Sequence, residues 1–133
     1  MHIIRTIFII DDDTDDQELL TEAIQDIDPS IGCRTAEDGL KAFHLLVAEM
    51  KTIPDLIFLD LNMPRMGGKQ FLAELKKHPD YRRIPVIIYT TSSEAEDIEE
   101  CSRLGAVDFI TKPTRPSKLR ELLRQVFAME WAL

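Results

Sequence analysis

Five polar side chains follow apolar runs in this sequence, and their types suit the chemistry of a phosphoryl group. They are Asp11, Asp12, Asp60, Thr90 and Lys112. Three neighbouring carboxylates repel one another strongly unless a cation lies between them. A hydroxyl and an ammonium suit the charged oxygens of a phosphoryl group in transfer. If these side chains lie together, they predict a cation site beside a phosphoryl-binding site.

The apolar runs predict the strands of a parallel sheet. Three of them are continuous stretches of Ile, Val, Leu and Phe, which is typical of strands covered on both faces. The expected strands are Thr6–Ile10, Ile31–Thr35, Asp55–Leu59, Pro85–Tyr89 and Ala106–Ile110. Because the carboxyl ends of parallel strands meet at one edge of a sheet, we expect the polar residues to converge there.

Helical patterns fill the gaps between these strands. They cover residues 15–27, 38–50, 68–77, 94–104 and 116–128. Asp38 suits an N-cap, and Pro116 suits the first position of the last helix. Ser93 and Glu96 match a capping box for the fourth helix. The strict alternation of strand and helix predicts an open α/β sandwich.

The inner faces of two expected helices differ in strength. For the helix at 38–50, the apolar residues expected to face the core are Phe43, Leu46, Val47 and Met50. The helix at 94–104 has only a thin stripe, which consists of Ala95, Ile98, Cys101 and Leu104. A helix with so little apolar surface is expected to shift at little cost in free energy.

The carboxylates point to a hard divalent cation and to a covalent intermediate. Mg²⁺ prefers oxygen ligands and usually takes one or two carboxylates together with phosphate oxygens. A central carboxylate such as that of Asp60 can itself act as the nucleophile and form an aspartyl phosphate.

Four segments resemble the receiver domains of two-component response regulators, and the resemblance extends over nearly the whole chain. The segments are IIDDD at 9–13, FLDLNMPRMGG at 58–68, IYTT at 88–91 and FITKP at 109–113. Each motif alone is weak, but all four in order, each at a strand end, are specific. The resemblance implies a flavodoxin-like sandwich with five parallel strands in the order 2-1-3-4-5 and helices on both faces.

The resemblance also implies roles for the polar residues. Asp60 would accept a phosphoryl group from a phosphohistidine on a sensor histidine kinase or a histidine phosphotransfer protein. A Mg²⁺ or Mn²⁺ ion would be held by Asp11, Asp12, Asp60 and the backbone carbonyl of Asn62.

Further residues would bind the phosphoryl group or respond to it. Lys112 would pair with the carboxylates before transfer and with the phosphoryl group afterwards, and Thr90 would donate its hydroxyl. Phe109 would be the aromatic switch that turns inward as Thr90 shifts. The Lys112–Pro113 peptide bond is expected to be cis. Asn62 and Ser92 occupy positions that influence phosphoryl loss, and Thr91 is bulkier than the residue often found there.

The expected output is a contact with another protein. Residues 1–133 are expected to form a single receiver domain with no output domain and no enzymatic activity beyond its own phosphorylation and dephosphorylation. The expected output face comprises the helix at 94–104, the strand at 106–111 and the helix at 116–128. Phosphorylation-dependent homodimerisation is an alternative output, and Trp131 and its neighbours are a candidate interaction tail.

Composition excludes several other classes. With a net charge of −8, from 24 acids and 16 bases, the chain is poorly suited to non-specific nucleic-acid binding. The segment from Lys112 onward is locally basic, which we interpret as a solvated helix face. No apolar stretch is long enough to span a membrane. Cys33 and Cys101 lack metal-ligand spacing, which favours reduced residues of a cytoplasmic protein.

Three alternatives remain at this point. The acids at 11, 13, 15 and 22 match part of a calcium-binding EF-hand loop, although Asp16 stands where glycine is needed. A haloacid-dehalogenase-like phosphatase would place the phosphoryl group on Asp11 instead of Asp60. A receiver that signals without phosphorylation would be a constitutive interaction module. Asp13, Asp15 and Asp16 are otherwise interpreted as a solvated helix start.

Overall fold

The computed structural model describes residues 3–129, so Trp131 lies outside the described residues. Its strands are β1 (Thr6–Ile10), β2 (Gly32–Ala36), β3 (Leu56–Leu59), β4 (Val86–Thr90) and β5 (Asp108–Thr111). Its helices are α1 (Thr14–Ile27), α2 (Gly39–His44), α3 (Gly68–Lys77), α4 (Ala95–Arg103) and α5 (Pro116–Ala128), and α2 continues as the π-helix η1 (Leu45–Glu49). The expected alternation of strands and helices is confirmed, and no boundary differs by more than two residues.

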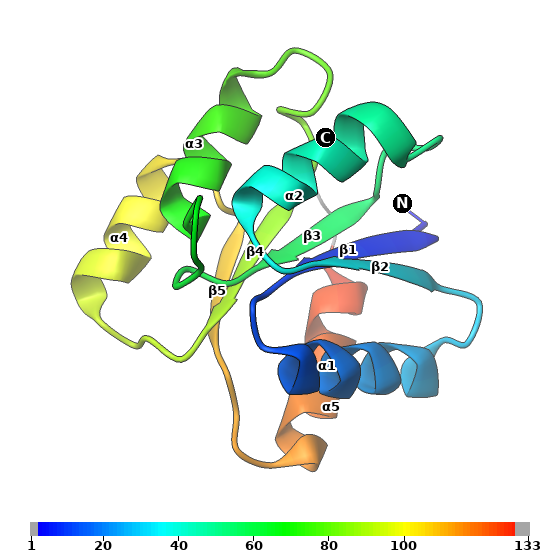
Figure 1. The fold of residues 1–133 in the computed structure, drawn as a ribbon. Coiled ribbons are helices and arrows are strands. Elements are labelled where there is room, and N and C mark those ends of the chain that lie inside the picture. The colour runs from blue at the N-terminus through cyan, green and yellow to red at the C-terminus, as the bar shows by residue number, and fades with distance from the viewer. Residues whose placement is uncertain (1–2, 130–133) are drawn as a thin grey trace.

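All strand pairs are parallel, and the strand order is 2-1-3-4-5, as expected. Helices α1 and α5 cover one face of the sheet, and α2, α3 and α4 cover the other (Figure 1). The first and last described helices therefore lie side by side, although they are far apart in the sequence.

Successive strand residues point to opposite faces, so the sheet separates two apolar cores. Phe8 and Ile10 of β1 belong to the core under α2, α3 and α4. Ile7 and Ile9 belong to the core under α1 and α5. Burial on both faces explains why these runs contain no alternating polar residues.

The helix starts expected at Asp38 and Pro116 are confirmed, and the one expected for the fourth helix is not. Asp38 accepts a hydrogen bond from the Lys41 backbone N–H at 2.8 Å and caps α2. The capping box expected at Ser93 and Glu96 was wrong, because α4 begins at Ala95 and has no side-chain cap. The preceding residue, Ser92, donates its hydroxyl to Asp97 at 2.6 Å instead.

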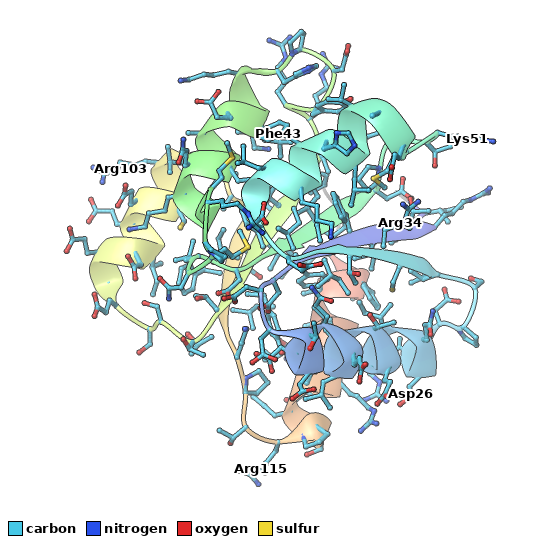
Figure 2. All side chains as sticks on the ribbon, in the orientation of Figure 1. Asp26, Arg34, Phe43, Lys51, Arg103 and Arg115 are labelled. Atoms are coloured by element: carbon cyan, nitrogen blue, oxygen red, sulfur yellow. The ribbon has the colours of Figure 1, made fainter. Side chains whose placement is uncertain are left out.

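The second helix also differs from its expected register. At its end the backbone N–H of Met50 donates to the carbonyl of Leu45, which is the wider spacing of a π-helix. The extra residue in that turn rotates Val47 out of the core, and its side chain is 65% exposed, so its expected core position was wrong. Phe43, labelled in Figure 2, keeps its inner position and packs on Phe71 with ring centroids 4.8 Å apart.

No helix among residues 3–129 is long and apolar enough to cross a membrane.

Candidate functional site

Strand register brings the sequence-distant acids to one edge of the sheet. Ile10 of β1 pairs with Leu59 of β3, so the residues that follow them, Asp11 and Asp60, end neighbouring strands. The backbone N–H of Asp60 donates to the carbonyl of Ile10 at 2.9 Å, which extends this pairing to the strand ends. The convergence expected from the apolar runs is therefore present.

Three carboxylates form a compact group of oxygen donors. One oxygen each from Asp11, Asp12 and Asp60 lies within 4.8 Å of the others. Asp11 and Asp60 are buried, and Asp12 is exposed. This donor set fits a hard divalent cation with one side open to solvent, because Mg²⁺ retains several waters and uses few carboxylates.

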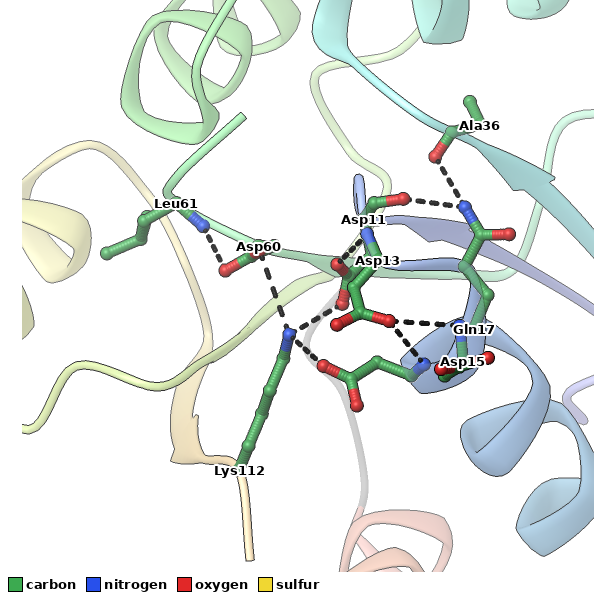
Figure 3. Close-up of polar contacts among 9 residues, drawn as sticks. Asp11, Asp13, Asp15, Gln17, Ala36, Asp60, Leu61 and Lys112 are labelled. Carbon is green, nitrogen blue, oxygen red and sulfur yellow. Dashed lines mark hydrogen bonds and ion pairs between the residues drawn. The ribbon is translucent and has the colours of Figure 1, made fainter. Parts of the chain in front are cut away.

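Lys112 supplies positive charge at the centre of this group. It follows β5, and its backbone N–H donates to the carbonyl of Thr90 at 2.7 Å. Its Nζ lies 2.8 Å from an oxygen of Asp11, 2.8 Å from one of Asp16 and 3.7 Å from one of Asp60 (Figure 3). The ammonium also lies 5.7 Å from the ring centroid of Tyr89. Without a cation, Lys112 is thus the counter-charge of the acids.

Burial and pairing act in opposite directions on the ionisation of these groups. Burial raises the pKa of Asp11 to about 6, although hydrogen bonds from Lys112 and from the Asp13 backbone N–H act to lower it. Burial alone would lower the pKa of Lys112, but hydrogen bonds to Asp11 and Asp16 outweigh it and raise that pKa above its usual value. Lys112 therefore stays charged at neutral pH.

Three buried hydrogen bonds hold the ends of the strands at this edge of the sheet. The side-chain amide of Gln17 donates to the carbonyls of Asp11 at 2.6 Å and of Ala36 at 3.2 Å. One carboxylate oxygen of Asp60 accepts from the Leu61 backbone N–H at 2.8 Å.

Sequence reasoning missed Gln17 and Asp16. Gln17 lies three residues before Leu20 on the buried face of α1, and its place there was the only available signal. Asp16 carried no signal of its own, because an acid in the first turn of a helix is ordinary.

Thr90 has a buried hydroxyl at the carboxyl end of β4. It is the last residue of β4, its side chain is fully buried, and its Oγ1 makes no hydrogen bond within the described part of the chain. A buried polar atom without a partner is uncommon and calls for an explanation, such as a bound group. Thr90 is adjacent to Lys112 through the backbone hydrogen bond described above.

Two other expected site residues lie further out. Phe109, the second residue of β5, is half-buried and lines a cavity of about 270 Å³ with Ile98, Cys101 and Val107. Asn62 is exposed in the loop that follows Asp60.

The Lys112–Pro113 peptide bond is trans, so the expected cis bond was wrong. The trans form is intrinsically favoured by about 0.5–1 kcal/mol before proline, and Lys112 reaches the acids from it.

The loop after Asp60 is attached at both ends. The Arg65 guanidinium donates through Nε to buried Asp38 at 2.9 Å, and Arg65 has a positive φ of 64°. The backbone N–H of Gly68 donates to the carbonyl of Leu61 at 3.0 Å. A Cβ at Gly68 would collide with the Asp60 carbonyl oxygen and would lie 2.7 Å from the Leu61 Cα. Glycine therefore lets α3 begin directly against the end of β3.

Comparison with known proteins agrees with this site. The family model of the response regulator receiver domain matches residues 7–124. The chain belongs to this family. The response regulator Rcp1 of Synechocystis sp. is 32% identical to this receiver domain over 130 residues, which are 95% of this chain and 86% of Rcp1.

Two solved structures support the same assignment. The crystal structure of the phosphorylated cyanobacterial phytochrome response regulator RcpA matches with a TM-score of 0.83 and 33% identity, over 93% of this chain and 91% of that one. The Mn²⁺-bound form of Rcp1 matches with a TM-score of 0.81 and 29% identity, over 92% and 91%. Several other relatives are longer, and this receiver domain spans under a third of their length.

The receiver fold also removes two alternatives. Asp13 caps α1, which begins at Thr14, so the stretch expected to form a calcium loop is mostly helix. The match to the receiver family over residues 7–124 replaces the phosphatase interpretation of the acidic motif.

Proposed function

We propose that the chain is a phosphoacceptor receiver in a two-component phosphorelay, with Asp60 as the residue that takes the phosphoryl group. One observation carries this proposal. The Asp60 side chain is only 7% exposed, yet it lies among the carboxylates of Asp11 and Asp12 and 3.7 Å from the Lys112 ammonium. A nucleophile, a set of cation ligands and a positive charge are thus gathered at one edge of the sheet.

The transfer forms one bond and breaks one. A carboxylate oxygen of Asp60 bonds to phosphorus, and the phosphorus–nitrogen bond of a phosphohistidine breaks. The leaving imidazole keeps the electron pair and takes up a proton. The donor in this proposal is a sensor histidine kinase or a histidine phosphotransfer protein.

The surrounding residues stabilise charge on the phosphoryl oxygens. A divalent ion, Mg²⁺ or Mn²⁺, supplies Lewis-acid neutralisation of that charge when bound. Asp11, Asp12, Asp60 and the Asn62 carbonyl are the ligands we propose for it. Lys112 contributes its ammonium, and the hydroxyl of Thr90, which makes no hydrogen bond within residues 3–129, donates to a phosphoryl oxygen.

The phosphorylated state is then transmitted to another protein. Engagement of Thr90 draws the half-buried Phe109 ring inward, into space bounded by Ile98 and Cys101. Helix α4, strand β5 and helix α5 form the output face, which a partner protein or a second copy of the chain binds without direct DNA contact. The domain performs no chemistry except its own phosphorylation and dephosphorylation. The free Cys33 and Cys101 agree with a cytoplasmic location.

Intact mass spectrometry tests the phosphoacceptor. The chain is incubated with acetyl phosphate and Mg²⁺, beside an Asp60→Asn variant and an Asp15→Asn control that removes an exposed acid. We expect one phosphoryl group on the wild type and on the control. We expect none on Asp60→Asn, and none on any sample when the divalent cation is chelated.

Two results would contradict the proposal in different ways. A labelled Asp60→Asn variant would move the phosphoacceptor to another acid. If the wild type stays unlabelled with both acetyl phosphate and a phosphorylated histidine kinase, the chain is a constitutive interaction module.

A further inference from the structure

Asp16 is the second strong partner of Lys112, and the five strand-end residues do not include it. It lies in the first turn of α1, and its side chain is 31% exposed. Its Oδ2 accepts a hydrogen bond from the Lys112 Nζ at 2.8 Å, the same distance as that to Asp11. The sequence had suggested a solvated helix acid at this position.

The distances show where the ammonium is held. Lys112 has two carboxylate oxygens at 2.8 Å, from Asp11 and Asp16, while that of Asp60 is 3.7 Å away. The third distance is longer than a hydrogen bond. The Lys112 side chain is only 9% exposed, so little water competes for the ammonium. The ammonium therefore lies closer to the carboxylates of Asp11 and Asp16 than to that of Asp60.

We propose that Asp16 is a positioning residue that holds Lys112 off Asp60 and so leaves Asp60 free for a divalent cation and for nucleophilic attack. This inference rests on the proposed function of the site. It assigns a role to a residue that touches neither the phosphoryl group nor the cation.

The argument depends on what Lys112 would do without Asp16. Within residues 3–129, the ion-pair partners left to Lys112 would be Asp11 and Asp60, and both are proposed cation ligands. The ammonium would move toward them and compete with the cation for the same oxygens. Asp16 limits this competition, above all at Asp60, because it offers Lys112 a carboxylate outside the proposed cation site.

Calorimetric titration of the full chain with Mg²⁺ tests this role without a phosphodonor. Asp16→Asn is compared with Asp15→Asn, which removes the same charge from an exposed neighbour on the same turn. Relative to this control, we expect Asp16→Asn to raise the Kd for Mg²⁺ roughly fivefold, which is the upper range for a partly exposed ion pair. Asp16→Glu should restore much of the affinity, because it keeps the carboxylate.

A second background separates action through Lys112 from a direct effect of charge on the cation. In Lys112→Met protein, Asp16→Asn and Asp15→Asn should change the Mg²⁺ affinity equally.

Labelling by acetyl phosphate gives a third readout. For Asp16→Asn, its rate should fall at limiting Mg²⁺ and return toward the wild-type rate at saturating Mg²⁺. Urea unfolding of each variant checks that the fold is intact.

Each contrary result has a distinct meaning. Equal Mg²⁺ affinities for Asp16→Asn and Asp15→Asn in the wild-type background would overturn the role of Asp16. A difference that persists in Lys112→Met protein would also overturn it, since Asp16 would then act on the cation directly. A wild-type chain that fails to bind Mg²⁺ would overturn the cation site and the role of Asp16 together. A wild-type chain that binds Mg²⁺ but is not labelled would contradict only the phosphoacceptor proposal.

Discussion

At the scale of single residues, Asp11 has the most constrained environment in the site. It is buried at the end of β1 between the Lys112 ammonium and the backbone N–H of Asp13. Burial nevertheless prevails and raises its pKa to about 6, from the ordinary value of 3.8. The native carboxyl therefore binds a proton more tightly than the unfolded one.

This difference predicts a specific pH dependence. Between about pH 4 and pH 6 the native state binds more protons at Asp11 than the unfolded state does, so its contribution to stability falls as pH rises. That contribution is fully present below the unfolded pKa of 3.8 and is lost as pH rises through about 6. Metal-free wild type should thus gain stability relative to Asp11→Asn as pH falls from 7 to 4.

Urea unfolding of both proteins in chelator, at several pH values, measures this difference. Taking the difference between the two proteins cancels the titration of acids that do not interact with Asp11. A difference that stays constant over the range would mean that Asp11 has no raised pKa in the native state.

At the scale of elements, the close approach of α3 to β3 determines where the loop after Asp60 can run. We expect Gly68→Ala to destabilise the fold by about 2–3 kcal/mol or more, because its Cβ would meet backbone atoms of Asp60 and Leu61. Gly32→Ala is the matched control, since its Cβ would have its nearest neighbour at 3.9 Å. Urea unfolding of both variants gives the two values. A Gly68→Ala variant as stable as Gly32→Ala would show that the loop can relax.

The elements that the sequence predicted well are those with local signals. Continuous apolar runs identified the strands, and Asp38 and Pro116 identified two helix starts. The strand-end positions of Asp60 and Lys112 followed from the runs before them.

The features that could not be predicted from the sequence depend on tertiary contacts or on the local backbone conformation. Val47 is exposed because the helix widens into a π-turn, which periodicity does not reveal. Asp16 contacts Lys112 because the end of β5 and the start of α1 lie at the same edge of the sheet. Helix α4 was expected to shift freely. Its single buried residue, Cys101, agrees with this, but Lys69 of α3 also holds it through Asp97 at 2.7 Å.

At the scale of the whole molecule, cation binding should be linked to folding. The three proposed carboxylate ligands come from the ends of β1 and β3, so the site exists only when the sheet is formed. A ligand that binds only the native state stabilises it by mass action, by about 1.4 kcal/mol at ten times its Kd. We expect that increase in the free energy of unfolding when Mg²⁺ is added to the wild type.

The Asp12→Asn variant tests whether Asp12 is a cation ligand without disturbing the fold. Asp12 is exposed, so without Mg²⁺ the variant should unfold within about 0.5 kcal/mol of the wild type. With Mg²⁺ it should gain much less stability than the wild type does. Unfolding in NaCl of matched ionic strength controls for general screening of the acidic chain. An equal gain for both proteins would remove Asp12 from the proposed ligands.

The partition of the interior by the sheet has a consequence for how such a domain can diverge. The two cores share strands but no side chains, so substitutions beneath α1 and α5 and those beneath α2, α3 and α4 should have additive energies. During evolution, residues of one core can then be substituted while those of the other core stay the same. The strand ends have no such freedom. Phe109 packs against one core, while Lys112 lies near Tyr89 of the other. A substitution at this edge of the sheet must therefore be compatible with the packing of both cores.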